Sequence, residues 1–436
     1  MSVKTLDSST PEFRRFLSST LTRPAGSANI DARVAAIIRA VRREGDRALL
    51  RFNEKFDHVR LPPGRLRVSA VELQDARKTI APADRRALEL AARRIANFHK
   101  RTIERPFGYR DPLGMSLGQL VRPLSRVGIY VPGGQGAYPS SVLMNAIPAK
   151  VAGVGEIVMV SPPSIGGDNP GVLAAAAIAG VDEVYRVGGA QAIAALAFGT
   201  RTIRPVDKIV GPGNAWVQAA KRMVYGVADI DKMAGPSEVT VIADDRANPA
   251  WIAADLIAQA EHGSGDESAI LLTPSKRLAG KVAGALEEAL KTLPRAAAVR
   301  RVLRKRSALI VVRDLAEAFQ IANRIAPEHL ELELASPRKW LDKIESAGAV
   351  FLGAMSPAPL GDYIAGPNHV LPTGGSARFA SPLGAYDFIK RTSIIESSAA
   401  GLSRLAPAVA RLARMEGFEG HARAVEIRKN GRTHAG

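Results

Sequence analysis

The 436-residue sequence contains no cysteine. Disulfides, thiolate zinc sites, iron–sulfur clusters and a thiol nucleophile are therefore excluded, and any metal must be held by histidine, carboxylate or amide oxygen. No apolar run reaches the ~20 residues that a membrane-spanning helix needs. The opening MSVKTLDSSTPEF also lacks the apolar core of a secretory signal. We therefore expect a cytoplasmic protein with no membrane partner.

Acidic residues are fewer than basic ones. The sequence has 42 Asp and Glu and 60 Lys and Arg, which gives a formal net charge of +18. The basic residues are spread through helical stretches rather than collected in one tail, and no RNA-binding aromatic motif or zinc finger accompanies them. This pattern favours a solvated or anion-attracting surface, so we expect no nucleic-acid partner. The charge nevertheless motivates one alternative, a non-catalytic protein that binds nucleotides or nucleic acid.

Short β-rich runs alternate with alanine-rich helical segments from residue 126 onward. This alternation is typical of parallel sheets covered by helices on both faces. It predicts an α/β fold with two doubly wound parallel-sheet domains. The runs are RVGIYV (126–131), EIVMV (156–160), EVYRV (183–187), KIVG (208–211), EVTVIA (238–243), AILLTP (269–274), ALIVVR (308–313), HLELEL (329–334) and AVFLG (349–353).

Changes in composition and the positions of Pro- and Gly-rich segments suggest where the domains begin and end. A polar N-terminal arm is expected over residues 1–25, and a Pro- and Gly-rich loop over 106–124 marks a boundary. A larger, discontinuous α/β domain is expected from residues 26–122 and 238–375, with a second domain over 123–237 between them. Residues 376–436 are expected to form a mainly helical C-terminal tail.

Glycine-rich loops follow three strands of the 123–237 domain. They are Gly133-Gly134-Gln135-Gly136, Gly188-Gly189-Ala190-Gln191 and Gly211-Pro212-Gly213-Asn214. Each follows a strand and precedes a helix, at the edge of an open α/β sheet where ligands bind. None fits G-x-G-x-x-G. Tight turns use glycine in any case, but the three loops together suggest a nucleotide or phosphate site of irregular type.

The stretch NPAWIAADLIAQAEHG (248–263) predicts a short apolar helix, capped by Asn248 and ended by Gly263. At about 100° per residue, Asp255, Gln259 and His262 share one face of it. Buried polar groups need partners. Either a side-chain hydrogen-bond network or a metal ion or polar ligand would satisfy them.

Four histidines, 262, 329, 369 and 421, stand in polar, turn-rich strings, whereas His58, His99 and His434 are expected at the surface. Glu328 and His329 open a predicted strand, where neighbours point to opposite faces unless the strand begins irregularly after Pro327. Together they would supply two bases near neutral pH. A strand-end ion pair is the alternative. Gln259, His262 and Asp362 offer ligand types suited to zinc, manganese or cobalt.

Six strings, in this order, closely resemble the histidinol dehydrogenase family. They are GPGNAWV, AGPSEVTVIAD, DLIAQAEHG, IAPEHLEL, GDYIAGPNHVLPTGG and EGFEGHARAVEIR, and the likeness runs from about Asp31 to Arg428. The resemblance implies oxidation of L-histidinol through histidinal to L-histidine with two NAD, at the end of histidine biosynthesis. It also implies incomplete Rossmann-like domains, with NAD on residues 123–237, and one zinc ion per subunit.

The resemblance also implies roles for individual residues. Zinc would be held by Gln259, His262, Asp362 and His421, which would also contact the substrate. Glu328 and His329 would be the acid–base pair, with His329 touching the substrate. Further substrate contacts would be Ser237, His369 and Glu416, and the NAD contacts would be Tyr130, Gln191 and Asn214. The family's tail crosses to the other subunit of a homodimer, so Glu416 and His421 would complete the partner's site.

One further alternative stays close to this family. A paralogous zinc and NAD dehydrogenase acting on another small polyol, such as a dihydroxypropane sulfonate, would share much of the sequence. The strings GPSEV, PNHVLPT and EGFEGH, which carry substrate contacts in the histidinol enzymes, argue against it.

Overall fold

The computed structural model describes residues 3–22, 28–133, 137–233, 235–262 and 265–429. The chain divides into two compact units. The core unit comprises residues 1–102 and 125–388, and the tail unit comprises residues 103–124 and 389–436. Among the described residues, no helix is both long and apolar enough to cross a membrane.

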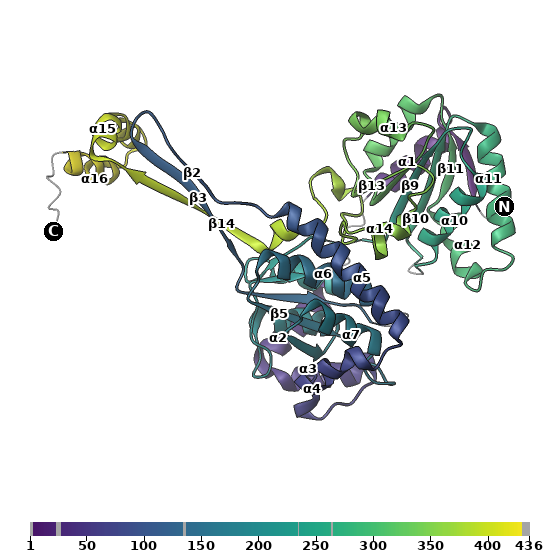
Figure 1. Cartoon of the computed structure of the whole chain (residues 1–436), viewed down its shortest axis with the longest axis horizontal. Coiled ribbons are helices and arrows are strands. Elements are labelled where there is room, and N and C mark those ends of the chain that lie inside the picture. The colour runs from purple at the N-terminus through teal and green to yellow at the C-terminus, as the bar shows by residue number, and fades with distance from the viewer. Residues whose placement is uncertain (1–2, 23–27, 134–136, 234, 263–264, 430–436) are drawn as a thin grey trace. The chain divides into compact units, whose positions relative to one another are not determined.

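The first part of the core unit is built on a five-stranded parallel sheet, which includes the strand labelled β5 in Figure 1. Its strand order is β6-β5-β4-β7-β8. Its strands are β4 (Arg126–Tyr130), β5 (Glu156–Ser161), β6 (Glu183–Arg186), β7 (Lys208–Val210) and β8 (Asp229–Ile230). Of these five strands, β4 comes first in the chain and lies in the middle of the sheet. The later strands lie on both sides of it. This is the doubly wound order, whose ligand crevice lies at the carboxyl ends of the strands.

Helices cover both faces of this sheet. One face carries a single core formed with α2 (Ala28–Glu44), α3 (Asp46–Phe52), α8 (Gly189–Phe198) and α9 (Ala215–Val224). The helices on the other side are α4 (Ala70–Asp75), α5 (Pro82–His99), α6 (Pro139–Ala152) and α7 (Pro170–Ala179), with α6 in contact with β4 and β5. Strands buried on both faces explain why their sequences are almost continuously apolar.

The second part of the core unit is a six-stranded parallel sheet in the order β1-β11-β10-β9-β12-β13 (Figure 1). Its strands are β1 (Lys4–Asp7), β9 (Glu238–Ala243), β10 (Ser268–Thr273), β11 (Ala308–Val311), β12 (His329–Glu333) and β13 (Ala349–Leu352). One face packs on α10 (Pro249–Ala260), α11 (Lys276–Ala289) and α12 (Ala296–Lys305), and the other on α1 (Pro11–Leu21) and α13 (Leu315–Ile325). The predicted α/β class with two doubly wound parallel sheets is confirmed.

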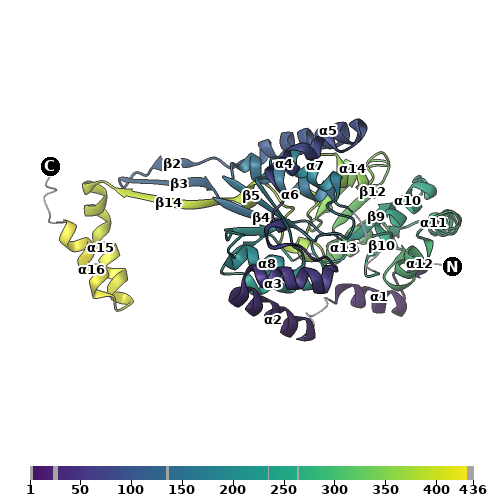
Figure 2. The same ribbon diagram turned by 90° about the horizontal axis from the view of Figure 1, so that it is seen from below.

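The tail unit is a three-stranded antiparallel sheet followed by two helices (Figure 2). Its elements are β2 (Phe107–Arg110), β3 (Met115–Pro123), β14 (Ile389–Ser397), α15 (Ala399–Met415) and α16 (Glu419–Lys429). β14 pairs with β3 along its whole length, from Ile389 opposite Pro123 to Ser397 opposite Met115. The two helices pack through small side chains, including Ala410, Ala413 and Ala422. The helical character of the C-terminal tail is confirmed.

The structure differs from the predicted boundaries in three places. Within the expected arm, residues 1–25, the described residues 3–22 are packed on the core, because β1 extends the six-stranded sheet beside β11 and α1 packs on α13. The helices of residues 28–52 belong with the five-stranded sheet rather than with residues 238–375, because their apolar faces share its core. The predicted boundary loop at 106–124 contains β2 and β3, and the tail begins with a strand, because these segments pair with each other across the sequence.

Candidate active site

The start of β12 brings Glu328 and His329 together. Helix α13 ends at Ile325, and Ala326 turns the chain with a left-handed φ of 51°. Glu328 therefore lies ahead of the regular strand, and its Oε2 is 3.6 Å from His329 Nδ1. Both side chains are buried. The irregular strand start that this pairing requires is present.

The first residue of β9 orients both side chains. The N–H of Glu238 donates to Glu328 Oε2 at 2.9 Å, and the carbonyl oxygen of Glu238 lies 3.1 Å from His329 Nδ1. A carbonyl can only accept a hydrogen bond, so His329 Nδ1 carries a proton and Nε2 is directed into the site. There Nε2 lies 3.4 Å from Asp362 Oδ1. The site thus forms at the amino ends of β9 and β12.

Burial and neighbouring charges shift the proton affinities in this cluster. Burial raises the pKa of Glu328, and the charge of His329 offsets this only in part. Burial by itself would lower the pKa of His329, but the carboxylates of Glu328 and Asp362 outweigh it and raise that pKa to about 9. Burial opposes charge on Asp362 too, yet its contacts with His329 hold its pKa below the usual value. A charged imidazole–carboxylate pair beside a second carboxyl group suits acid–base chemistry.

Helix α10 presents Gln259 and His262 near this cluster. Asn248 caps the helix as predicted, since its Oδ1 accepts the N–H of Ala250 at 2.9 Å. Gln259 is buried, and its Nε2 is enclosed without a hydrogen-bond partner in the described part of the chain. His262 is exposed, with Nδ1 3.1 Å from the Gln259 carbonyl oxygen, and its charge interacts with Glu328 and Asp362. The predicted helix end at Gly263 falls outside the described residues.

The predicted polar face of α10 divides into two environments. Gln259 and His262 serve the cluster just described, whereas Asp255 interacts with Glu331 and Glu333 of β12. Asp255 thus lies among other carboxyl groups, apart from Gln259 and His262, and a ligand at Gln259 and His262 stays a prediction.

Asp362 links His369 to the Glu328–His329 pair, and Ser237 directly precedes Glu238. Asp362 belongs to α14 (Ala358–Tyr363), and its carbonyl oxygen accepts a hydrogen bond from His369 Nδ1 at 2.8 Å. Burial lowers the pKa of His369, although the charge of Asp362 acts in the opposite direction. Ser237 is half-buried and directly precedes Glu238, whose backbone orients the acid–base pair. Asp362 is thus linked to both His329 and His369.

The core unit supplies only part of the predicted metal-binding set. In the ranges that the structure describes, no three histidine or carboxylate side chains converge as a metal site. His262 and Asp362 are two such groups in the core unit, and Gln259 would add an amide oxygen. His421 and Glu416 are exposed residues of the tail unit, at α16 and at the end of α15. Their approach to the core unit's side chains stays a prediction.

The predicted dinucleotide residues line one cavity of about 900 Å³ in the first part of the core unit. Tyr130 ends β4, and its hydroxyl accepts the N–H of Gly189 at 3.2 Å. Asn214 caps α9, accepting the N–H of Trp216 at 3.0 Å, and Gln191 lies in the first turns of α8. Two of the predicted glycine loops contribute Gly133 and Gly189 to the lining. Residues 134–136 of the first loop lie outside the described residues.

Sequence reasoning missed two acidic residues and misplaced one histidine. Glu238 looks like an ordinary strand residue, yet burial and the charge of Glu328 raise its pKa to about 7. Asp57 lines the cavity although it comes from a helical stretch far away in the sequence. His99 was expected at the surface, but it is 1% exposed and burial lowers its pKa to about 4. A charged residue at the first position of a buried strand was the available signal for Glu238.

Comparison with known proteins gives a consistent result. Residues 22–429 match the family model described as histidinol dehydrogenase. The curated histidinol dehydrogenase of Nitrosomonas europaea is 54% identical over 404 residues, covering 92% of each chain. That of Aquifex aeolicus is 53% identical over 399 residues, covering 91% of this chain and 92% of the relative. The crystal structure of histidinol dehydrogenase from Elizabethkingia anophelis is similar with a TM-score of 0.92, at 36% identity and 98% coverage of both chains.

Proposed function

Because the chain belongs to the histidinol dehydrogenase family, we propose that it oxidises L-histidinol through L-histidinal to L-histidine and passes two hydrides to two NAD molecules. Family membership makes the protein an oxidoreductase of histidine biosynthesis. The observation that carries the detailed proposal is the buried Glu328–His329 pair, oriented by the backbone of Glu238 and contacting Asp362. The same geometry provides two distinct proton acceptors at one place.

The two acceptors suit two chemically different steps. In the first, the neutral form of His329, whose fraction grows as pH rises toward its raised pKa, would accept the alcohol proton through Nε2 as the carbinol carbon loses a hydride to NAD. The resulting aldehyde must gain an oxygen from water before a second hydride can leave. Enzymes with a reactive cysteine capture such an aldehyde as a thiohemiacetal, which a chain without cysteine cannot do. Glu328 instead accepts a proton from the water that adds to the aldehyde carbon.

The residue types near this pair fit a zinc ion or a similar divalent cation. Gln259 is buried and would offer its side-chain amide oxygen, and His262 uses Nδ1 on a carbonyl, which leaves Nε2 available as a ligand. Asp362 would add a carboxylate, and His421 of the partner subunit would complete a four-ligand set. When bound, the cation would orient the imidazole and amino groups of the substrate. Ser237, His369 and Glu416 are the further proposed substrate contacts.

The cavity of the five-stranded sheet fits the dinucleotide. It lies at the carboxyl ends of the strands and is lined by Tyr130, Gln191 and Asn214. When bound there, NAD would supply the hydride acceptor for both oxidations. Tyr130 is fixed by its hydrogen bond from Gly189, so the tight glycine turn and the ring form one preformed wall.

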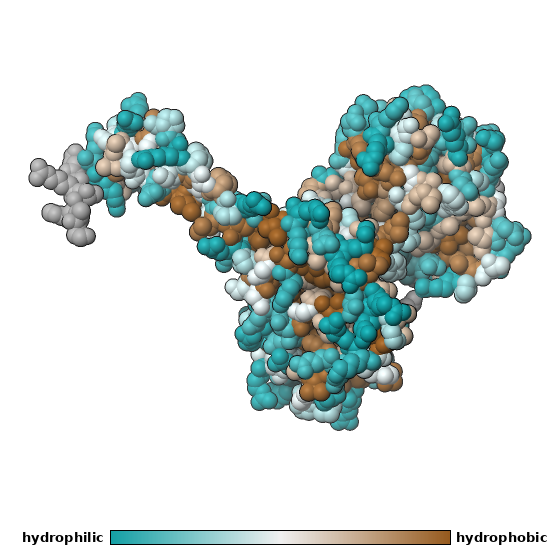
Figure 3. Space-filling view, viewed as in Figure 1, coloured by the Kyte–Doolittle hydropathy of each residue, from teal (hydrophilic) through white to brown (hydrophobic). Residues whose placement is uncertain are grey.

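The surface of the tail unit supports a homodimer with shared sites. Large apolar side chains are exposed along its strands and helices, and apolar patches follow the strands in Figure 3. They include Ile395 at 72%, Met415 at 75% and Ile427 at 73% exposure. A small sheet with two helices that leaves such side chains in water gains stability by burying them against another surface. A second copy of the chain would provide that surface and receive Glu416 and His421.

The division of labour between the two bases can be tested by replacing Glu328 with glutamine. The amide keeps the side chain's size and can still accept the N–H of Glu238, but it cannot take a proton from water. We expect oxidation of added histidinal to fall by roughly 10²- to 10⁴-fold, with a much smaller effect on alcohol oxidation. NADH formed per histidinol consumed should then fall from two toward one.

The exposed Glu345→Gln variant is the matched control, because it removes a carboxylate far from any predicted site residue in the sequence. Equal loss of both oxidation steps in Glu328→Gln would contradict the assignment of water activation to Glu328. One NADH per histidinol in the unmodified protein would contradict the full oxidation.

A further inference from the structure

An unusual turn places Asp57 at the wall of the cavity. Directly after α3, the chain forms one π-helical turn, η1 (Asn53–Asp57), which ends at His58 with a left-handed φ of 56°. Neither feature is favoured locally, and both are frequent at functional sites. A hydrogen bond fixes the start of the turn, because the buried Asn53 donates through Nδ2 to the carbonyl oxygen of Arg186 at 2.8 Å. Phe52 and Phe56 stack across the turn with ring centroids 5.5 Å apart.

The carboxylate of Asp57 has unused hydrogen-bonding capacity. Asp57 lines the cavity, and its Oδ2 is enclosed without a hydrogen-bond partner among the described residues. Burial raises the pKa of Asp57 to about 6, although the charge of His58 acts in the opposite direction. The side chain is therefore mostly ionised at neutral pH and lacks the donors that an ionised carboxylate needs.

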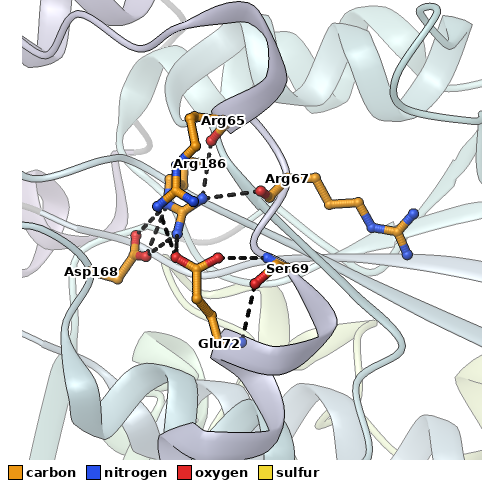
Figure 4. A network of polar contacts seen from close by, with 6 residues as sticks. All are labelled: Arg65, Arg67, Ser69, Glu72, Asp168 and Arg186. Carbon is orange, nitrogen blue, oxygen red and sulfur yellow. Dashed lines mark hydrogen bonds and ion pairs between the residues drawn. The ribbon is translucent and has the colours of Figure 1, made fainter.

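The basic group of the same cavity is fully occupied. Arg186 donates through Nε and Nη2 to Asp168, through Nη2 also to Glu72, and through Nη1 to the carbonyl oxygens of Arg65 and Arg67 (Figure 4). A guanidinium group has five N–H donors, and these contacts account for all of them. Asp168 is likewise paired with Arg186. Among the described lining residues, Asp57 is the charged group left for a ligand.

In doubly wound sheets that bind NAD, an acidic residue near the end of the second strand accepts hydrogen bonds from the adenosine ribose. Here the second strand is β5, and Pro162, Pro163 and Ser164 directly follow it. The one carboxylate of the loop between β5 and α7 is Asp168, which is already paired with Arg186. At the usual place, no carboxylate of the described residues is therefore left for the ribose. Asp57, carried in by the π-helical turn, supplies a carboxylate to the same cavity.

We propose that Asp57 accepts hydrogen bonds from the ribose diol of the adenosine half of the dinucleotide and makes the cavity select NAD over NADP. The inference rests on the proposed use of NAD. Two hydroxyl groups would satisfy the carboxylate oxygens of Asp57. A 2′-phosphate would instead add roughly two negative charges beside Asp57, and Arg186 has no donor free to compensate them.

Equilibrium binding measured by titration calorimetry tests this assignment on the full-length protein without requiring turnover. Asp57→Asn should weaken NAD binding roughly 10- to 100-fold, the usual effect of losing hydrogen bonds to a charged group. Binding of NADP should weaken less or improve, so the ratio of the two affinities should shrink. The probe 2′-deoxy-NAD should bind the unmodified protein weakly and should lose little further affinity in the variant.

Glu54→Gln is the matched control, because Glu54 is an exposed carboxylate in the same turn that does not line the cavity. Thermal denaturation of both variants establishes that the turn is intact. Unchanged NAD and NADP affinities in Asp57→Asn, with NAD bound normally by the unmodified protein, would overturn the role of Asp57. Failure of the unmodified protein to bind NAD at all would instead overturn the proposed function.

Discussion

Replacing Glu331 by glutamine should make the protein more stable at alkaline pH and leave it almost unchanged at pH 5. Glu331 and Glu333 follow His329 at alternate positions of β12 and therefore share its face of the sheet, where Asp255 of α10 interacts with both. Glu331 is 1% exposed. Its Oε1 accepts the N–H of Ala358 at 2.7 Å, while Oε2 is enclosed without a partner among the described residues.

The size of the effect follows from the proton affinity of Glu331. Burial, reinforced by the charge of Asp255, raises the pKa of Glu331 from 4.5 to about 8. A carboxyl group with a raised pKa binds its proton more tightly in the folded chain, so the stability it contributes is lost as pH rises through that range. Each tenfold change in proton affinity corresponds to about 1.4 kcal/mol, which sets an upper limit of about 5 kcal/mol. Because Asp255 titrates in the same region, we expect roughly half of that.

The measurement is the thermal unfolding midpoint of both proteins between pH 5 and pH 9. Glutamine can still accept the N–H of Ala358 but cannot ionise, so the advantage of Glu331→Gln should grow steadily between pH 5 and pH 8 and then level off. The exposed Glu345→Gln variant should show no such trend. A stability difference that is constant across the pH range would refute the argument that ionisation of this buried carboxyl opposes folding.

Two further predictions concern the five-stranded sheet. Gly211→Ala should destabilise the protein by at least about 2 kcal/mol and weaken NAD binding, because Gly211 has φ +115° and a methyl group would collide with the carbonyl oxygen of Tyr130. Gly226→Ala, with φ +100° but open space, should cost less in the same denaturation experiment. Lys221→Met should cost about 3–5 kcal/mol in chemical denaturation, because the buried carboxylate of Asp231 loses its ion-pair partner and keeps only the N–H of Gly211. Adding Asp231→Asn should restore part of the loss, and no restoration would count against this pairing.

Local signals in the sequence were sufficient for most of the two parallel sheets, although β1 was expected to be part of an arm. Runs buried on both faces read as continuous apolar strands, and helix starts were marked by side chains that satisfy free amides. Ser69 and Glu72 form a capping box at the start of α4, and Asn248 caps α10 as predicted. The antiparallel tail sheet was missed because β3 and β14 pair across more than 260 residues of sequence and neither alternates cleanly between apolar and polar positions.

The geometry of the candidate site also could not be predicted from local sequence patterns. The sequence indicated which residue types were available, and the resemblance grouped Glu328, His329 and Asp362 before any geometry was known. Ahead of the contact between Glu328 and His329, Ala326 leaves the helix in a left-handed conformation, and residues 326–328 separate α13 from β12. No local pattern announces such a turn, because alanine has no preference for it.

The sequence by itself determined which reactive groups are available. There is no thiol, two bases are adjacent in the chain, and amide, imidazole and carboxylate groups occur in recognisable strings. Local propensity and periodicity also indicated most helices and strands of the two parallel sheets, since these depend on neighbours in the chain. Only the tertiary structure decided that a π-helical turn carries Asp57 to the cavity, that Arg186 is saturated, and that Asp255 lies with Glu331 rather than with Gln259. Those outcomes depend on which distant backbones approach each other and on which donors and acceptors remain unpaired when they do.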